Sequence, residues 1–264
     1  TMNRYISALS PFAKWLAASD LVDSPIMVDD MFIKLDRTKP KRAQFSDEQL
    51  KTLFGSPLFR GCLSDTAEHK PGSFTIRDWR YWLPLIALFS GMRLGEIAQL
   101  LVDDVQDMHG IWVTHVTTDG DDAKKLKTVG SERIVPVHSE LIALGLLDYH
   151  KRIREAGQKR LFPEIKPDSR GFMSGVPSKF LNTYLDRIGV KTKLLTMHSF
   201  RHLFTDRLRK TYLDSEFGFI LGHGDRLVRT TGRYGVLPQG TVTHRSKLIE
   251  SVLFDELDLK GLYI

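Results

Sequence analysis

One β-prone interval, residues 105–137, lies in a chain whose other periodic segments have helical spacing. The run Ile111-Trp112-Val113 favours extended structure, and His109-Gly110 is typical of a turn between strands. We expect a small antiparallel sheet here, near the N-terminal half of the chain, with a hairpin over residues 126–137 that carries Lys127 near its tip. The predicted fold class is therefore α+β, mainly α-helical.

In the rest of the chain, apolar side chains recur at three- and four-residue steps, which is the spacing of helix faces. Ser46 and Gln49 have the form of a capping box, and Gly91 is typical of a helix end. Residues 55–75 are rich in Gly, Pro and Ser and are expected to form a loop. The predicted helices cover residues 1–19, 46–54, 77–90, 139–156, 177–188 and 199–211, a short helix that ends at Leu221-Gly222, and a last helix within 240–254.

The sequence also indicates where the chain divides. Residues 34–44 read K-L-D-R-T-K-P-K-R-A-Q, which is basic, polar and interrupted by Pro40, so they are typical of a linker. We expect residues 1–44 to be the end of an N-terminal domain plus this linker, and residues 45–264 to form the main domain.

Composition sets weak limits on function. Lys and Arg number 38 against 32 Asp and Glu, so the formal net charge is +6. A polyanionic partner is plausible, although a mildly basic soluble protein explains the same balance. Cys62 is the only cysteine, which excludes an intramolecular disulfide and favours a reducing cytoplasm. No apolar run reaches the roughly 18 residues of a membrane helix, so we expect no membrane association.

The first candidate site motif follows Gly91. Arg93 and Glu96 lie three residues apart, so a helix would make them neighbours. A guanidinium oriented by a carboxylate is a good phosphate clamp, whereas a surface ion pair of the same residues would contribute little.

The second motif runs from His198 to Tyr234. It offers His198 and Arg201, then His223 after Leu-Gly, then Tyr234 on a Gly-flanked stretch. His198 and His202 have a metal-like spacing, but Ser199 stands where a metalloprotease has Glu, so no metal is expected. We expect His202 to be a core residue or to support the site from behind.

These residue types suit phosphoryl transfer, in which catalysis is mostly positioning and stabilisation of negative charge. Arg93, Arg201 and His223 could replace a metal ion, because guanidinium groups stay charged and bond bidentately. A phenol such as that of Tyr234 needs cationic neighbours or a base to act as a nucleophile, since its pKa is about 10.

Four blocks of the sequence resemble the catalytic domain of a tyrosine recombinase of the phage-integrase family, and they occur in the family's order along the chain. Gly91–Leu100 resembles its first arginine box, His198–Arg201 its His-x-x-Arg box, and Leu221–Tyr234 its Leu-Gly-His followed by Tyr. The hairpin with Lys127, Arg133 and Pro136 resembles the family's catalytic-lysine hairpin.

The resemblance implies that Tyr234 attacks a DNA phosphate to form a 3′-phosphotyrosyl link and a free 5′-hydroxyl. Arg93, Arg201 and His223 would bind the non-bridging oxygens, and Lys127 would protonate the leaving oxygen. Loop length leaves Lys124 or Lys125 open for that role. His198 would assist, Glu96 would orient Arg93, and no cofactor or metal would be required.

The resemblance also implies partners. We expect double-stranded DNA, a homotetramer on DNA assembled through the C-terminal segment Leu248–Ile264, and a monomer without DNA. The implied setting is the cytoplasm, at a bacterial nucleoid or from a phage or other mobile element. A topoisomerase-like enzyme and a catalytically silent DNA-binding module stay open as alternatives. The expected DNA contacts are Lys41, Arg42, Lys124, Lys125, Arg133 and Arg207.

Overall fold

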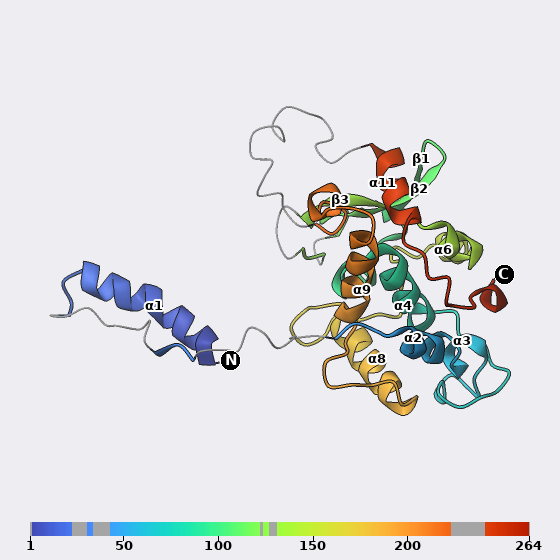
Figure 1. Cartoon of the computed structure of the whole chain (residues 1–264), viewed down its shortest axis with the longest axis horizontal. Helices are drawn as coiled ribbons and strands as arrows, with labels where there is room; N and C mark the ends of the chain where they lie inside the picture. The colour runs from blue at the N-terminus through green and yellow to red at the C-terminus, as the bar shows by residue number, and fades with distance from the viewer. Residues whose placement is uncertain are drawn as a thin grey trace. The chain divides into compact units, whose positions relative to one another are not determined.

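The computed structural model describes residues 2–22, 31–33, 43–121, 124–126, 131–222 and 241–263. Its contacts divide the chain into Thr1–Lys41 and Arg42–Ile264 (Figure 1). This division falls close to the boundary expected between residues 44 and 45. That the first unit is the end of an N-terminal domain stays a prediction.

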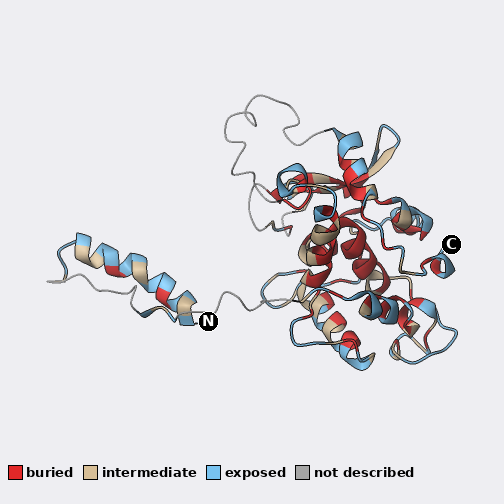
Figure 2. Cartoon of the chain, in the orientation of Figure 1, coloured by how far each residue is buried: buried red, intermediate tan, exposed pale blue. Residues whose placement is uncertain are grey.

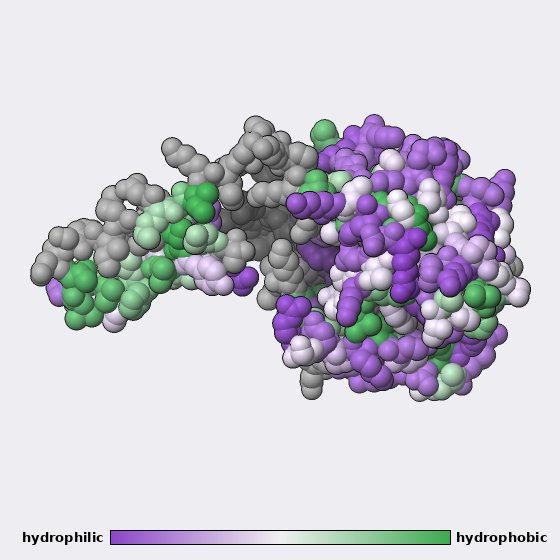
Figure 3. Space-filling model, turned by 90° about the horizontal axis from the view of Figure 1, so that it is seen from below, coloured by the Kyte–Doolittle hydropathy of each residue, from purple (hydrophilic) through white to green (hydrophobic). Residues whose placement is uncertain are grey.

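The first unit contains one helix, α1 (Met2–Ala18), with Pro11 inside it. Ile6 and Ala13 are buried against Phe32. The segment 31–33 is tied to the helix because Asn3 exchanges two hydrogen bonds of 2.8 Å with the backbone of Ile33. On the face shown in Figure 3, the described part of this unit is largely hydrophobic. Its exposed apolar side chains on α1 are Met2, Tyr5, Leu9, Phe12 and Trp15.

The second unit is built around helix α4 (Trp79–Ser90), which is buried from Tyr81 to its end (Figure 2). Asp78 caps its first turn by accepting a hydrogen bond from the Arg80 amide at 2.8 Å. Gly91 ends the helix at φ 61°, and a Cβ there would lie 2.5 Å from the Phe204 ring of helix α9 (His198–Arg209). Glycine is therefore required both by the left-handed backbone and by the close approach of the two helices.

Short helices surround α4. The Ser46–Gln49 capping box is confirmed at the start of α2 (Asp47–Phe54). The remaining helices are α3 (Pro57–Arg60), α5 (Leu94–Ala98), α6 (Ser139–Ala143), α7 (Leu146–Glu155), α8 (Gly175–Arg187), α10 (Asp214–Phe217) and α11 (Val242–Glu250), with 3₁₀ turns η2 (Val102–Asp104) and η5 (Lys260–Leu262).

The expected antiparallel sheet is present, with strands β1 (Val105–Met108), β2 (Ile111–Val116) and β3 (Arg133–Pro136) in that order. His109 and Gly110 form the β1–β2 turn with φ of 59° and 83°, as the two-residue turns of hairpins require. β3 pairs with β2, with Val116 opposite Arg133. The described partner of β3 is therefore β2, and the expected hairpin tip with Lys127 lies outside the described residues.

Two helix predictions need correction. The helix expected over residues 139–156 is two helices, because Gly145 adopts φ 88° between α6 and α7. The loop expected over residues 55–75 contains α3, which has Pro57 at its first position, where a missing amide proton costs nothing. None of the described helices is long and apolar enough to cross a membrane.

The C-terminal segment packs on its own unit in the single chain. Leu259 and Leu262 are buried in the main core, and Arg60 donates to the carbonyl of Asp258. The Tyr263 hydroxyl donates to Glu140 at 2.7 Å.

Candidate functional site

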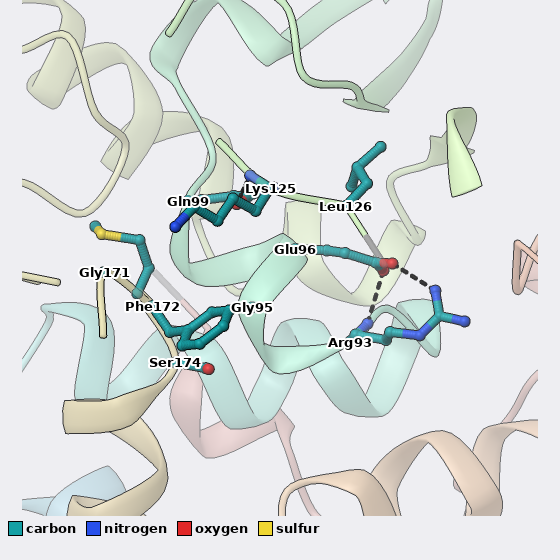
Figure 4. A pocket seen from close by; sticks show the side chains of 10 residues that line it. Arg93, Gly95, Glu96, Gln99, Lys125, Leu126, Gly171, Phe172 and Ser174 are labelled. Carbon is teal, nitrogen blue, oxygen red and sulfur yellow. Dashed lines mark hydrogen bonds and ion pairs between the residues drawn. The ribbon is translucent and has the colours of Figure 1, made fainter. Parts of the chain in front are cut away.

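Arg93 is held by its own helix. It is the N-cap of α5, and the Glu96 carboxylate three residues later accepts a hydrogen bond from the Arg93 amide at 2.9 Å. The second carboxylate oxygen accepts from Arg93 Nη1 at 2.6 Å (Figure 4). The side chain of Glu96 is only 4% exposed and that of Arg93 is 22% exposed. The pair is therefore not the weak surface ion pair that was the alternative.

A second arginine shares the same carboxylate. Arg133, at the start of β3, donates from Nη2 to Glu96 at 2.7 Å, and its side chain is fully buried. Burial alone would raise the pKa of Glu96. The charges of Arg133 and Arg93 and their hydrogen bonds outweigh burial and hold that pKa below its usual value. Glu96 is therefore a carboxylate at neutral pH that is shared between two cations.

The third arginine comes from α9. Arg201 is 4% exposed and donates from Nη1 to the Gly91 carbonyl at 2.9 Å and from Nη2 to the Leu221 carbonyl. Burial lowers the pKa of Arg201 to about 9, and the charges of Arg93 and Arg133 act in the same direction. Arg201 and Arg133 bond to the adjacent carbonyls of Leu221 and Ile220, and Arg133 shares Glu96 with Arg93, so the three guanidinium groups lie near one another. Arg201 stays protonated at neutral pH.

The cluster therefore carries excess positive charge. Of the described charged groups that act on Arg201, two are arginines and one, Glu96, is a carboxylate. An added negative charge near these three cations would relieve the repulsion that the described charges exert on Arg201.

His198 begins α9, and its backbone amide donates a hydrogen bond to the Thr196 hydroxyl oxygen at 3.2 Å. The ring of His198 meets the ring of His202 edge to face, with centroids 4.8 Å apart. Among the described residues, no group of three or more His, Cys, Asp or Glu side chains is arranged to hold a metal ion.

The two lysines that precede Lys127 have different environments. Lys124 is 1% exposed and bonds to both carboxylate oxygens of Asp104 at 2.9 Å, so it faces the interior. Lys125 is exposed, and its Nζ lies 5.3 Å from the ring centroid of Phe172. Lys125 and Arg93 line one pocket of about 270 Å³ (Figure 4). The pocket brings an exposed lysine and the first arginine to the same hollow.

Two expected DNA contacts are corrected by burial, and a third is heavily paired. Lys124 and Arg133 have no exposed side-chain surface to offer to DNA, because each is consumed by internal bonds. Arg207 bonds to Asp47 at 3.2 Å and to Glu256, so its charge is already matched by two carboxylates. Lys41, Arg42, Lys127, His223 and Tyr234 lie outside the described residues.

The fold and the site together define the catalytic domain of a tyrosine recombinase. The profile of the phage integrase family matches residues 64–235, which is more than half of the chain. The chain belongs to the phage integrase family, whose members are tyrosine-type site-specific recombinases. The predicted family and the predicted fold are thereby confirmed.

One solved structure supports the fold, and two others are similar to this chain. Lambda integrase, crystallised as a dimer bound to a COC′ core site, shares 15% identity over 83% of this chain and 70% of its own, with a TM-score of 0.55. The integrase of mycobacterium phage Brujita shares 19% identity over 94% of this chain and 70% of its own, at a TM-score of 0.44. The site-specific recombinase XerH, bound to a palindromic difH substrate after cleavage, shares 16% identity over 70% of this chain and 48% of its own, with a TM-score of 0.45. No curated protein matches this chain.

Proposed function

We propose that this chain cleaves and rejoins double-stranded DNA through a 3′-phosphotyrosyl intermediate at the arginine cluster around Glu96. The observation that carries the proposal is the excess charge of that cluster: Arg93, Arg133 and Arg201 act on one another, and one buried carboxylate is shared among them. A phosphodiester in the act of substitution spreads negative charge over its non-bridging oxygens, which is the charge that such a cluster stabilises.

In the proposed reaction the Tyr234 phenol oxygen forms a bond to phosphorus as the bond to the 5′-oxygen breaks. Arg93, Arg201 and His223 hold the non-bridging oxygens. The phenol gives up its proton with the help of His198, and the leaving 5′-oxygen takes a proton from a lysine. The reverse attack by a 5′-hydroxyl of a second duplex restores the phosphodiester, so no external energy source is consumed.

Lys127 is the lysine we propose for the leaving group. Lys124 is poorly suited to the role, since a 1% exposed ammonium bonded to Asp104 has neither access to DNA nor a free path for its proton. Lys125 stays the alternative to Lys127, because it lines the pocket next to Arg93.

A library of nicked duplexes tests the reaction without knowledge of the target sequence. The sequence near the nick is randomised because the target sequence is unknown. Cleavage next to the nick releases a short strand with a 5′-hydroxyl, and loss of that strand leaves the covalent adduct trapped. We expect adducts that survive SDS, a recurring DNA sequence among them, and a DNA-linked peptide containing Tyr234 in mass spectrometry. Tyr234→Phe should abolish the adduct, and Tyr212→Phe, the matched control on α9's C-terminal side, should keep it.

The outcomes separate the alternatives. Adducts that persist in Tyr234→Phe would move the nucleophile elsewhere, and DNA binding without any adduct would indicate a silent binding module. Wild-type adducts without strand exchange between two duplexes of the recovered sequence would favour the topoisomerase-like alternative.

The wider setting is part of the proposal. Integration or excision of a mobile element in the cytoplasm is the use that family membership supports. A homotetramer on DNA would require the segment Leu248–Ile264 to leave its own core, where Leu259 and Leu262 are buried. Sedimentation of the recovered DNA complex, with Leu262→Asp as the perturbed variant, measures that assembly.

A further inference from the structure

We propose that Arg133 is a positioning residue that fixes Glu96, and through it Arg93, while also holding the turn that leads into His223. The inference rests on the proposed function for its consequence in catalysis, and on the bonding of one buried side chain for its geometry.

The Arg133 guanidinium bonds in three directions. Nη2 donates to Glu96 at 2.7 Å, Nε donates to the Ile220 carbonyl at 2.5 Å, and Nη1 donates to the Ser131 carbonyl at 2.8 Å. A planar group with five donors can bond in this way, whereas the ammonium of lysine is a single charged point on a flexible stem. Arg133 therefore joins the start of α5, the start of β3 and the turn after α10.

Glu96 connects Arg133 to Arg93, because its carboxylate accepts hydrogen bonds from both arginines. One of its oxygens accepts from Arg133 Nη2 and from the Arg93 amide, and the other accepts from Arg93 Nη1 at 2.6 Å and from Arg133 Nη1 at 3.4 Å. The carboxylate plane is thus fixed from the Arg133 side, and its second oxygen fixes the direction of Arg93. Without Arg133, the carboxylate would keep only its two bonds to Arg93 and lose the fully buried arginine that contacts both of its oxygens.

The turn after α10 is held by two arginines at adjacent carbonyls. Arg133 donates a hydrogen bond to the Ile220 carbonyl, and Arg201 donates one to the Leu221 carbonyl. Gly222 follows at φ 66°, and a Cβ there would lie 2.9 Å from Arg133 Nη1. The glycine of the Leu-Gly-His motif is therefore required because the buried guanidinium occupies the space next to it. The residue that follows this fixed turn is His223.

Three variants separate charge, geometry and simple stability. Arg133→Met removes the charge and the bonds, and Arg133→Lys keeps the charge but not the three directions. Arg245→Met is the matched control: Arg245 is 3% exposed and donates from α11 to the Ile134 carbonyl of the same strand at 2.8 Å. Its charge also acts on Arg133, so this variant measures the loss of a neighbouring buried arginine that the proposed reaction does not use.

Two measurements are made on each variant. The first is the titration of the Glu96 carboxyl carbon by ¹³C NMR, assigned with Glu96→Gln, which does not depend on activity. The charged groups around this carboxylate are Arg93 on α5, Arg133 on β3 and Arg201 on α9, with Lys125 lining the same pocket. The second is single-turnover covalent capture against pH, with DNA affinity measured separately, on the duplex recovered by the wild type.

We expect Arg133→Met to raise the pKa of Glu96, because burial is then opposed by one arginine instead of two. We expect its capture rate to fall about 100-fold with DNA affinity nearly unchanged, as for a misplacement of about 1 Å in an active site. A new loss of rate at acid pH should follow the raised pKa. Arg133→Lys should keep Glu96 ionised but still capture slowly, and Arg245→Met should leave both the titration and the rate near wild type.

Other results would overturn the inference. They are capture at the wild-type rate in both Arg133 variants, a loss of DNA affinity at an unchanged rate, or the same slowing in Arg245→Met. If Arg133→Met does not fold, Arg133→Lys decides between a slow and a normal rate. If the wild type captures no DNA at all, the proposed function fails, and an unchanged Glu96 titration in Arg133→Met would still refute the link between these residues.

Discussion

Glu96→Gln is the sharpest test of the site, because it removes the charge of the carboxylate that is shared by two arginines. Arg133 is fully buried and would keep an unmatched charge, while Arg93, at 22% exposure, is partly compensated by water. Breaking a buried ion pair by loss of one partner costs about 3–5 kcal/mol. The glutamine amide also turns a donor toward one of the two guanidinium groups, so the isosteric shape offers little relief.

The thermal effect can be worked out from the size of the unit. For a domain of 150–250 residues, each kcal/mol shifts Tm by about 2–4 °C, so the loss corresponds to roughly 6–20 °C. The free energy of unfolding is measured by urea titration with far-UV circular dichroism at pH 7. Glu48→Gln is the control, because Glu48 is 82% exposed and pairs with Lys51 at 2.9 Å on the surface of α2. Its urea midpoint should stay close to that of the wild type, because an exposed ion pair contributes little.

The stability difference between the wild type and Glu96→Gln should depend on pH. The folded pKa of Glu96 is lowered, so its contribution to stability is fully present above the unfolded pKa and is lost as pH falls through the folded value. The stability gap between wild type and Glu96→Gln should therefore narrow as the pH is lowered from 7 toward 3. A gap below about 1 kcal/mol at pH 7, or a gap of constant size down to pH 3, would refute the shared buried carboxylate.

Three further predictions follow from the same contacts. Gly222→Ala should lower Tm and slow covalent capture, because φ 66° alone costs about 1–2 kcal/mol and the new Cβ meets Arg133; a neutral melt and a normal rate would contradict this. Sulfate should raise Tm more than chloride at equal ionic strength, and Arg201→Met should remove that difference in a thermal-shift assay, since a bound anion stabilises the folded state by mass action. Lys124→Met should destabilise the fold by about 3–5 kcal/mol in urea titration, and adding Asp104→Asn should recover part of the loss; additive losses would argue against their buried pair.

The sequence predicted the elements whose evidence is local. The capping box at Ser46, the helix end at Gly91 and the turn at His109-Gly110 are each specified by a few adjacent residues, and each is present. The single helix predicted over residues 139–156 is wrong because Gly145 interrupts it. Its φ of 88° breaks the backbone between two amphipathic segments that share one apolar pattern.

The site was harder to predict where a charged residue is buried. Lys124 and Arg133 lie in polar stretches, where a basic side chain is usually solvated, so both were assigned to DNA. Strand alternation held a signal, because Arg133 and Val135 lie on one face of β3 and both are buried. The partners, Asp104 and Glu96, are distant in sequence, and no local pattern connects them to these two residues.

The arginine cluster holds Arg93 in a fixed direction, and burying its charges lowers the stability of the fold. A buried ion pair contributes little net free energy, because the desolvation of both charges offsets their attraction. Apolar side chains in place of Arg133 and Glu96 would fill the same volume without that cost, but they could not determine the direction of Arg93. Helix α4, which is buried from Tyr81 to its end, stops at Gly91 immediately before this cluster and supplies the apolar packing that makes the cost tolerable. A site assembled in this way has its cations in position before DNA arrives, so binding energy is not spent on bringing like charges together.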